Sequence, residues 1–187
     1  NTASITIGSP AVAPRMAREL ETEDMKVAER RFMEEVWNEG DYEVFEELVH
    51  DDYVGHWFSI DDEDTDYAGL KEFIQESRNG FSDFAMHEEF MFAEEDMIAV
   101  GATATGTHDG EFFDIPATNK DPGPTPVIMV HRFDDGQIIE GWATWDALGM
   151  MQNLGLVPQE FHLTDFLETG VNMARQGLVR RTAGDDD

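Results

Sequence analysis

The chemistry open to this chain rests on carboxylates, histidines, tyrosines and hydroxyls, because its 187 residues include no cysteine. Thiol nucleophiles, disulfide frameworks and cysteine-ligated zinc are therefore excluded. Asp146 follows the strand-like run 137–145 and precedes an apolar helical pattern. His131 lies in the preceding strand-like run, 126–133. His56 lies close to Tyr53 and Trp57. A carboxylate or imidazole beside apolar side chains can act as a general acid or base, so these residues point to proton transfer.

One hairpin predicts which side chains share a face with His131. The dipeptide 135–136, Asp-Gly between two apolar runs, predicts a two-residue turn. Counting pairs from this turn places His131 opposite Glu140, and Met129 opposite Trp142. That face mixes polar with apolar groups, as a ligand cavity does, so we expect it to line a pocket. The alternative is that this face is wet outer surface.

A second, purely structural interpretation exists for three candidate residues, His131, His108 and Asp146. His131 either lines the deep end of the pocket, with its ring proton held by Glu140, or forms an ordinary cross-strand pair. His108 follows a strand expected to run antiparallel to that of His131, so it should return toward Asp146 at the pocket mouth; a solvated loop histidine is the alternative. By itself, Asp146 is best interpreted as the N-cap of the helix that follows it.

Motifs for metals, nucleotides and serine nucleophiles do not occur in the sequence. We find no His-x-His or His-Glu-x-x-His pattern, no Gly-x-Gly-x-x-Gly, no P-loop and no Gly-x-Ser-x-Gly. We therefore expect neither a metal site nor a cofactor.

The charge of the chain is extreme, with 12 Lys and Arg against 41 Asp and Glu, a formal net charge of −29. Such a surface repels nucleic acids and anionic membranes, so neither is an expected partner. A content of 41% hydrophobic residues predicts that the chain folds. Self-repulsion of this size is relieved by high salt, and we expect a cytoplasmic protein of a high-salt organism. Residues 1–14 do not resemble a signal peptide.

The periodicity of apolar residues changes once along the chain. Helical spacing predicts a first helix over Glu23–Asn38, a short second helix capped by Asp41 and a third over Tyr67–Arg78. Strand-like runs then predict four strands, after a brief extended piece at 52–58. These runs are Met86–Glu94, Met97–Thr107, Pro126–Phe133 and Gln137–Trp145, and helices Asp146–Leu154 and Pro158–Leu178 follow.

This order predicts an α+β fold in which the N-terminal helices cover one face of a curved antiparallel sheet. We divide the chain into a flexible N-terminal segment (1–20), one domain (21–157) and a C-terminal helical extension with an acidic tail (158–187).

Several motifs occur together in an order that resembles the SnoaL-like polyketide cyclases, from about Arg30 to Leu156. This family belongs to the nuclear transport factor 2-like superfamily, whose cone-shaped fold encloses one pocket. The motifs are Val36–Asp41, Asp52–His56, Thr105–Phe112, Ile115–Thr118 and Phe133–Trp142, the last leading to Asp146.

The resemblance implies an aldol cyclisation or enolisation of a hydrophobic carbonyl compound, with Asp146 as general acid/base and His56 near the reacting carbonyl. His131 is a third catalytic candidate. The expected ligand contacts are Trp57, His108, Phe112, Met129, Glu140 and Trp142. The open sheet face of this fold commonly pairs with a second copy, so the resemblance also implies a homodimer.

Two departures favour a rival function. Gly141 stands where the family commonly has the histidine of Glu-His-Trp, and residues 114–117 read Asp-Ile-Pro-Ala instead of Gly-Ile-Pro-Pro. The alternative to an enzyme is a non-catalytic member of the fold that binds a small apolar ligand or serves as a dimer module.

Overall fold

The computed structural model describes residues 12–57 and 64–160, with side chains from Thr22 onward. The first helix, α1 (Val12–Arg31), continues without a break into the π-helix η1 (Phe32–Glu39). It ends at Gly40, which adopts a left-handed conformation with φ of 77°. The predicted end is confirmed, whereas the helix begins well before the predicted Glu23. The expected N-terminal segment therefore lies partly in α1, and residues 1–11 lie outside the described residues.

The π-helix turns two aromatic side chains toward the same side. Its wider i to i+5 repeat brings Phe32 and Trp37, five positions apart, to one face, with ring centroids 6.4 Å apart. Both side chains are buried and, as described below, line the same cavity. A regular α-helix would rotate one of them away.

Aspartates cap the other three helices of the described ranges. Asp41 accepts backbone N–H groups at the start of α2 (Tyr42–Leu48), and Asp66 does so for α3 (Tyr67–Gly80). Asp146 caps α4 (Ala147–Leu154) by accepting the N–H of Gly149. The capping roles of Asp41 and Asp146, which the sequence predicts from local chemistry, are confirmed.

The described residues include the six strands of one curved sheet, β1 (Val49–Trp57), β2 (Thr65–Asp66), β3 (Ala85–Glu94), β4 (Met97–Thr105), β5 (Thr125–Asp134) and β6 (Gln137–Trp145). Their order across the sheet is β2-β1-β6-β5-β4-β3. The central strands are antiparallel as predicted, but β1 runs parallel to β6, so the sheet is mixed and the antiparallel prediction is wrong there.

A bulge in β6 changes the predicted hairpin register. Phe133 pairs with Ile138 as expected, but Arg132 then pairs with Glu140, which leaves Ile139 as the extra residue. Beyond this point every pair is shifted by one, and His131 lies opposite Gly141. Since side chains alternate along a strand, the slip moves the side chain of Glu140 to the other face of the sheet.

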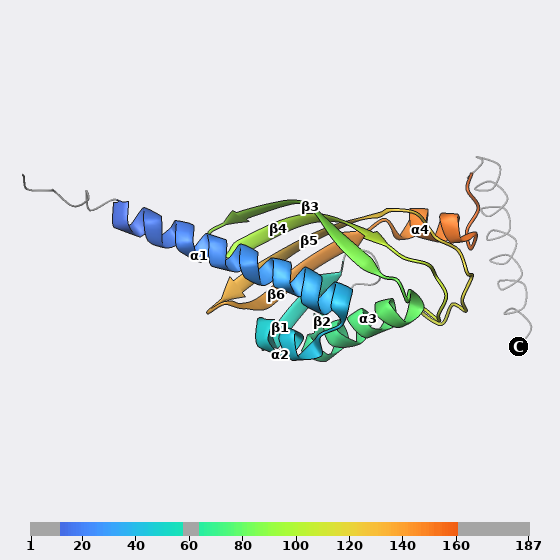
Figure 1. Ribbon diagram of the computed structural model, residues 1–187, viewed down its shortest axis with the longest axis horizontal. Coiled ribbons are helices and arrows are strands. Elements are labelled where there is room, and N and C mark those ends of the chain that lie inside the picture. Colours follow the sequence, from blue (N-terminus) through green and yellow to red (C-terminus); the bar gives the residue numbers. More distant parts are fainter. Residues whose placement is uncertain (1–11, 58–63, 161–187) are drawn as a thin grey trace, which may run out of the picture.

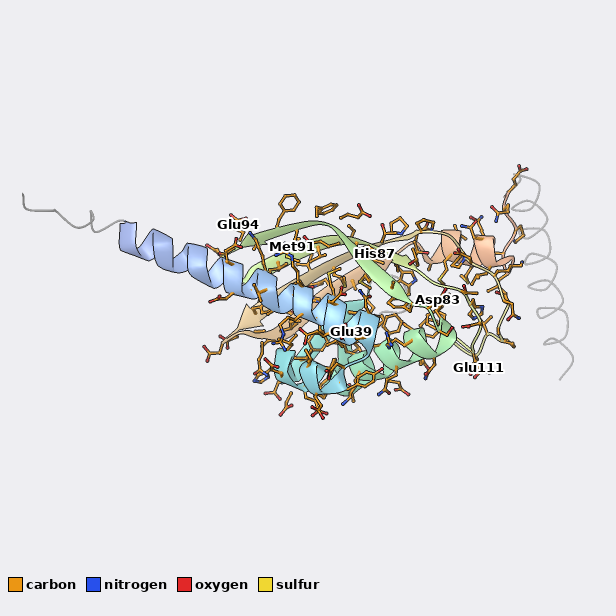
Figure 2. All side chains as sticks on the ribbon, viewed as in Figure 1. Glu39, Asp83, His87, Met91, Glu94 and Glu111 are labelled. Atoms are coloured by element: carbon orange, nitrogen blue, oxygen red, sulfur yellow. The ribbon has the colours of Figure 1, made fainter. Side chains whose placement is uncertain are left out.

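The helices α1, α2 and α3 lie on one side of the sheet, and α4 lies at one end of it (Figure 1). Between this helical layer and the sheet lies the main core, which includes Phe45, Ile74, Ile98 and Ile138, all fully buried. The edge strand β3 runs beside α1, and Figure 2 shows Met91 and Glu94 on that strand. The predicted α+β fold is therefore confirmed, while the expected helix at 158–178 lies beyond residue 160 for most of its length, outside the described residues.

Candidate functional site

A cavity lies between the concave face of the sheet and the helices η1 and α3. The space between its walls, counted together with the solvent at its open mouth, is about 930 Å³. The lining residues Phe32 and His131, near α1, are buried. Trp145 and Met150, near α4, are partly exposed, so the more open side of the cavity lies near α4. The walls are largely aromatic and aliphatic, and they include Phe32, Trp37, Trp57, Phe73, Phe112, Met129, Trp145 and Met150.

One hydrogen-bonded pair of ionisable side chains reaches this apolar cavity. His131, a lining residue on β5, donates from Nδ1 to Oε2 of Glu29 on α1 at 2.8 Å. Glu29 is fully buried, and its Oε1 has no hydrogen-bond partner among the described residues. Because Nδ1 is engaged by the carboxylate, Nε2 is the ring nitrogen left for a ligand. The edge of the Phe32 ring packs against the imidazole, with centroids 5.6 Å apart.

Tyr53 reaches the same end of the cavity from β1. Gly55 and Gly141 are paired neighbours on β1 and β6, and Gly141 is also paired with His131. A Cβ atom at Gly141 would lie 2.4 Å from the Tyr53 hydroxyl and 3.0 Å from Cδ2 of His131. The phenol therefore occupies the space left by the two glycines, and its hydroxyl and Cδ2 of His131 both border the position that a side chain at Gly141 would take.

The side chain of Asp146 lies outside the cavity lining. Its Oδ1 accepts the N–H of Gly149 at 2.9 Å, and the residue is exposed. Neighbours on both sides, Trp145 and Met150, do line the cavity. The cap interpretation of Asp146 is confirmed by this geometry, while its role as acid/base stays a prediction.

His56 lies on the outer face of the sheet. Its Nδ1 is 2.7 Å from Oδ1 of Asp64, its Nε2 is 3.0 Å from Oε1 of Glu140, and its ring stacks on Trp142. These two carboxylates, Glu140 first, raise the pKa of His56, an effect that partial burial opposes. Glu140 also pairs with Arg132 at 3.1 Å. The predicted partnership of Glu140 with His131 is therefore wrong, because the bulge at Ile139 turns Glu140 away from the cavity.

The remaining predicted contacts divide between wall and core. Trp57, Phe112 and Met129 line the cavity, as does Trp142, although its ring stacks on His56 outside. His108 is not a lining residue. It is almost fully buried, its Nδ1 accepts the backbone N–H of Thr118, and burial lowers its pKa. The expectation of a mouth or solvated loop position for His108 is therefore wrong.

Glu29 was not predicted, although the sequence carries a signal for it. It lies within the stripe of apolar residues that faces the core, between Met25 and Phe32. A charged residue on the buried face of an amphipathic helix requires a buried partner. The partner, His131, lies 102 positions away, and only the fold brings the two together.

The curved sheet, the helices on its concave side and the enclosed apolar cavity define a cone-shaped fold of the nuclear transport factor 2-like type. The profile of the SnoaL-like polyketide cyclases matches residues 27–154. The chain belongs to this family. A comparison with curated proteins gives no match.

Solved structures of similar proteins agree with the fold. IdmH from Streptomyces antibioticus, a candidate polyketide cyclase, has a TM-score of 0.62 at 26% identity, over 70% of this chain and 98% of that one. A candidate polyketide cyclase from Acidithiobacillus ferrooxidans has a TM-score of 0.62 at 27% identity, over 71% and 95%. AclR from Streptomyces galilaeus, a candidate hydroxylase, has a TM-score of 0.66 at 22% identity, over 86% and 98%, and shows likeness of fold alone.

Two further findings concern only the described part of the chain. No described helix is long and apolar enough to cross a membrane. No three histidine or acidic side chains among the described residues are grouped so that they could hold a metal ion.

Proposed function

We propose that the protein is an enzyme that moves a proton on a hydrophobic carbonyl compound held in the cavity, with His131 as its general base. The His131–Glu29 pair at the buried end of an apolar cavity carries this proposal. An imidazole held by a carboxylate through Nδ1 has a fixed orientation, and the carboxylate stabilises the imidazolium that forms when Nε2 accepts a proton.

The reaction needs only the substrate and the imidazole. Nε2 of His131 takes the proton from a carbon activated by an ester and a ketone, and an enolate forms. The enolate carbon attacks a second carbonyl of the same molecule, which forms the new carbon–carbon bond. The resulting alkoxide takes the proton back from the imidazolium. This aldol closure consumes no cofactor and returns the base to its starting state.

The positions of Asp146 and His56 favour His131 over both of them as the general base. The Asp146 carboxylate would have to leave its helix cap to reach the cavity, and His56 is held on the outer face by Asp64 and Glu140. The strongly negative surface favours a neutral or apolar substrate over an anionic one.

Proton exchange at the activated carbon of an aromatic β-keto ester tests the proposal. We expect the wild type to accelerate exchange into deuterated solvent, and His131→Gln to lose about 100-fold of that acceleration. The matched control is His87→Gln, which alters an exposed histidine on β3 (Figure 2). Equal exchange by His131→Gln and the wild type would overturn the role of His131, and loss confined to Asp146→Asn would transfer the role to Asp146.

The second candidate function is non-catalytic binding of a small apolar ligand. It is favoured by the cap geometry of Asp146 and by Gly141, which leaves no side chain where relatives commonly have a histidine. Saturable binding of the keto ester without faster exchange would support this alternative.

We also propose a homodimer that forms through the outer face of the sheet. Phe90, Gly101 and Ile128 form one row across β3, β4 and β5, and the two large side chains of that row are exposed. Phe92, on the same face, is 67% exposed and contacts Phe90 with ring centroids 5.5 Å apart. Large apolar side chains gathered on one face are typical of an interaction surface.

The acidic composition supports a proposal about habitat, the cytoplasm of a cell with high internal salt. Charges of one sign repel each other in the compact state, and molar salt shortens the range of that repulsion to about 3 Å.

A further inference from the structure

The buried end of the cavity contains a second polar group besides His131, the hydroxyl of Tyr53. Tyr53 is 4% exposed and lines the cavity. Its hydroxyl is not one of the fully enclosed polar atoms that lack a partner among the described residues, so it opens onto the cavity. A polar group at an apolar wall is costly to bury unless it is hydrogen-bonded, and a ligand oxygen in the cavity can supply that hydrogen bond.

The surroundings of Tyr53 keep it a neutral hydrogen-bond donor. Burial, with the negative charges of Glu29 and Glu140, raises the pKa of Tyr53 well above its ordinary value. A neutral phenol donates its proton to an acceptor oxygen. The free nitrogen of His131, in contrast, accepts a proton from a donor because Glu29 already holds Nδ1.

Two glycines make this arrangement possible. A Cβ at Gly55 would lie 2.8 Å from the Tyr53 hydroxyl, and a Cβ at Gly141 would lie 2.4 Å from it. Real Cβ atoms do not approach other atoms so closely, so any side chain at Gly141 displaces the hydroxyl or His131. Gly141 thus decides whether the tyrosine and the histidine can meet at one point.

We propose that Tyr53 and His131 form a two-point subsite for one oxygen of the ligand, at which Tyr53 donates to that oxygen and Nε2 of His131 accepts a proton from the same oxygen or from the adjacent carbon. The ligand class is therefore an enol, a phenol or an enolisable ketone on an aromatic frame. Phe32, whose ring packs against the imidazole, and Met129 contribute apolar wall to the same cavity.

This inference rests on the proposed function and names the group that holds the developing enolate oxygen. Tyr53 acts as a catalytic residue because it touches the reacting oxygen, and its hydrogen bond strengthens as negative charge gathers there. Glu29 is a positioning residue, because it acts only through the imidazole.

Binding of three naphthalene probes tests the subsite without any need for activity. 2-Naphthol can accept from Tyr53 and donate to His131, 2-acetylnaphthalene can only accept, and 2-methylnaphthalene can do neither. By fluorescence titration we expect the wild type to prefer 2-naphthol over 2-methylnaphthalene by about tenfold. Tyr53→Phe should remove most of that preference and leave the affinity for 2-methylnaphthalene unchanged.

The matched control is Tyr67→Phe, which removes a hydroxyl at a tyrosine that packs on Phe45 and does not line the cavity. It should keep the wild-type preference. Gly141→Ala should lose the preference as Tyr53→Phe does, because the added methyl displaces the hydroxyl.

The outcomes separate the two proposals. If no probe binds, the cavity does not take aromatic ligands and the proposed function fails with the subsite. If the probes bind without preference for 2-naphthol, or if Tyr53→Phe retains that preference, only the subsite is overturned. Because the preference of the wild type is itself a test, the result does not depend on the folding of any variant.

Discussion

The Nδ1 atom of His131 lies 2.8 Å from Oε2 of Glu29, across 102 positions of the chain and in the buried space between α1 and the sheet. The contact makes α1 part of the candidate site, although α1 otherwise serves to cover the sheet. A buried pair of ionisable side chains is weak grounds for stability, since burial costs both groups their hydration. Its position at the cavity instead gives it a function, which is to orient the imidazole.

Glu29→Gln should lower the rate of proton exchange by roughly tenfold, because a neutral amide no longer stabilises the imidazolium. Exchange rates of the wild type and the variant, measured under the same conditions, test this effect. Glu72→Gln, at an exposed position on α3, is the matched control and should keep the wild-type rate. A Glu29→Gln variant as fast as the wild type would remove Glu29 from the site.

Local features of the fold could be predicted from the sequence because their causes are local. The aspartate caps at Asp41 and Asp146, the end of the first helix near Gly40 and the turn at 135–136 each depend on neighbouring residues. The parallel pairing of β1 with β6 could not be predicted in this way, because the two strands are far apart in the sequence.

The site was predicted only in part, and one residue explains why Glu140 was assigned to the cavity. The extra residue Ile139 shifts the register, so Gly141 faces the cavity in place of Glu140. A bulge in a run of apolar residues leaves no turn signal in the sequence. His131 was assigned to the cavity correctly because it lies in β5, where the strand is regular, but its partner Glu29 could be found only from the fold.

Asp146→Ala should destabilise the protein by about 1 kcal/mol, whereas Asp146→Asn should be nearly neutral, because asparagine also caps helices well. The reason is the hydrogen bond from Gly149 N–H to Oδ1. Urea unfolding of the two variants measures the difference. Equal destabilisation by both substitutions would contradict the assignment of Asp146 as the cap of α4.

His56 should titrate above its ordinary value of 6.5, because Glu140 and Asp64 both stabilise its charged ring. Its folded-state pKa is raised, so its contribution to stability is full below the unfolded pKa and is lost as pH rises through the folded pKa. NMR titration of the ring protons should give a lower pKa in Glu140→Gln than in the wild type. Unchanged titration in that variant would mean that the contact of His56 with Glu140 does not persist in solution.

Phe92→Glu should convert a dimer to a monomer, because it places a charge on the exposed apolar face of β3 where a second copy would pack. Val27→Glu is the matched control, since Val27 is 56% exposed on α1 and lies away from the outer sheet face. Sedimentation at molar KCl, where charge repulsion is screened, measures the mass of each variant. A wild type that sediments as a monomer would remove the proposed interface, as would a Phe92→Glu variant that remains dimeric.

The melting temperature should rise between low salt and molar KCl, because the net charge of −29 destabilises the compact state and KCl screens it. The ion pairs of the surface act in the opposite direction, since Arg31 with Glu47 and Arg30 with Glu88 are weakened by salt. With 41 acidic residues against 12 basic ones, repulsion outweighs these attractions, so the net effect is stabilisation. Sucrose, which strengthens apolar burial without screening charge, is the control that isolates the electrostatic part. If the melting temperature stayed level in KCl, the acidic surface would not be an adaptation to salt.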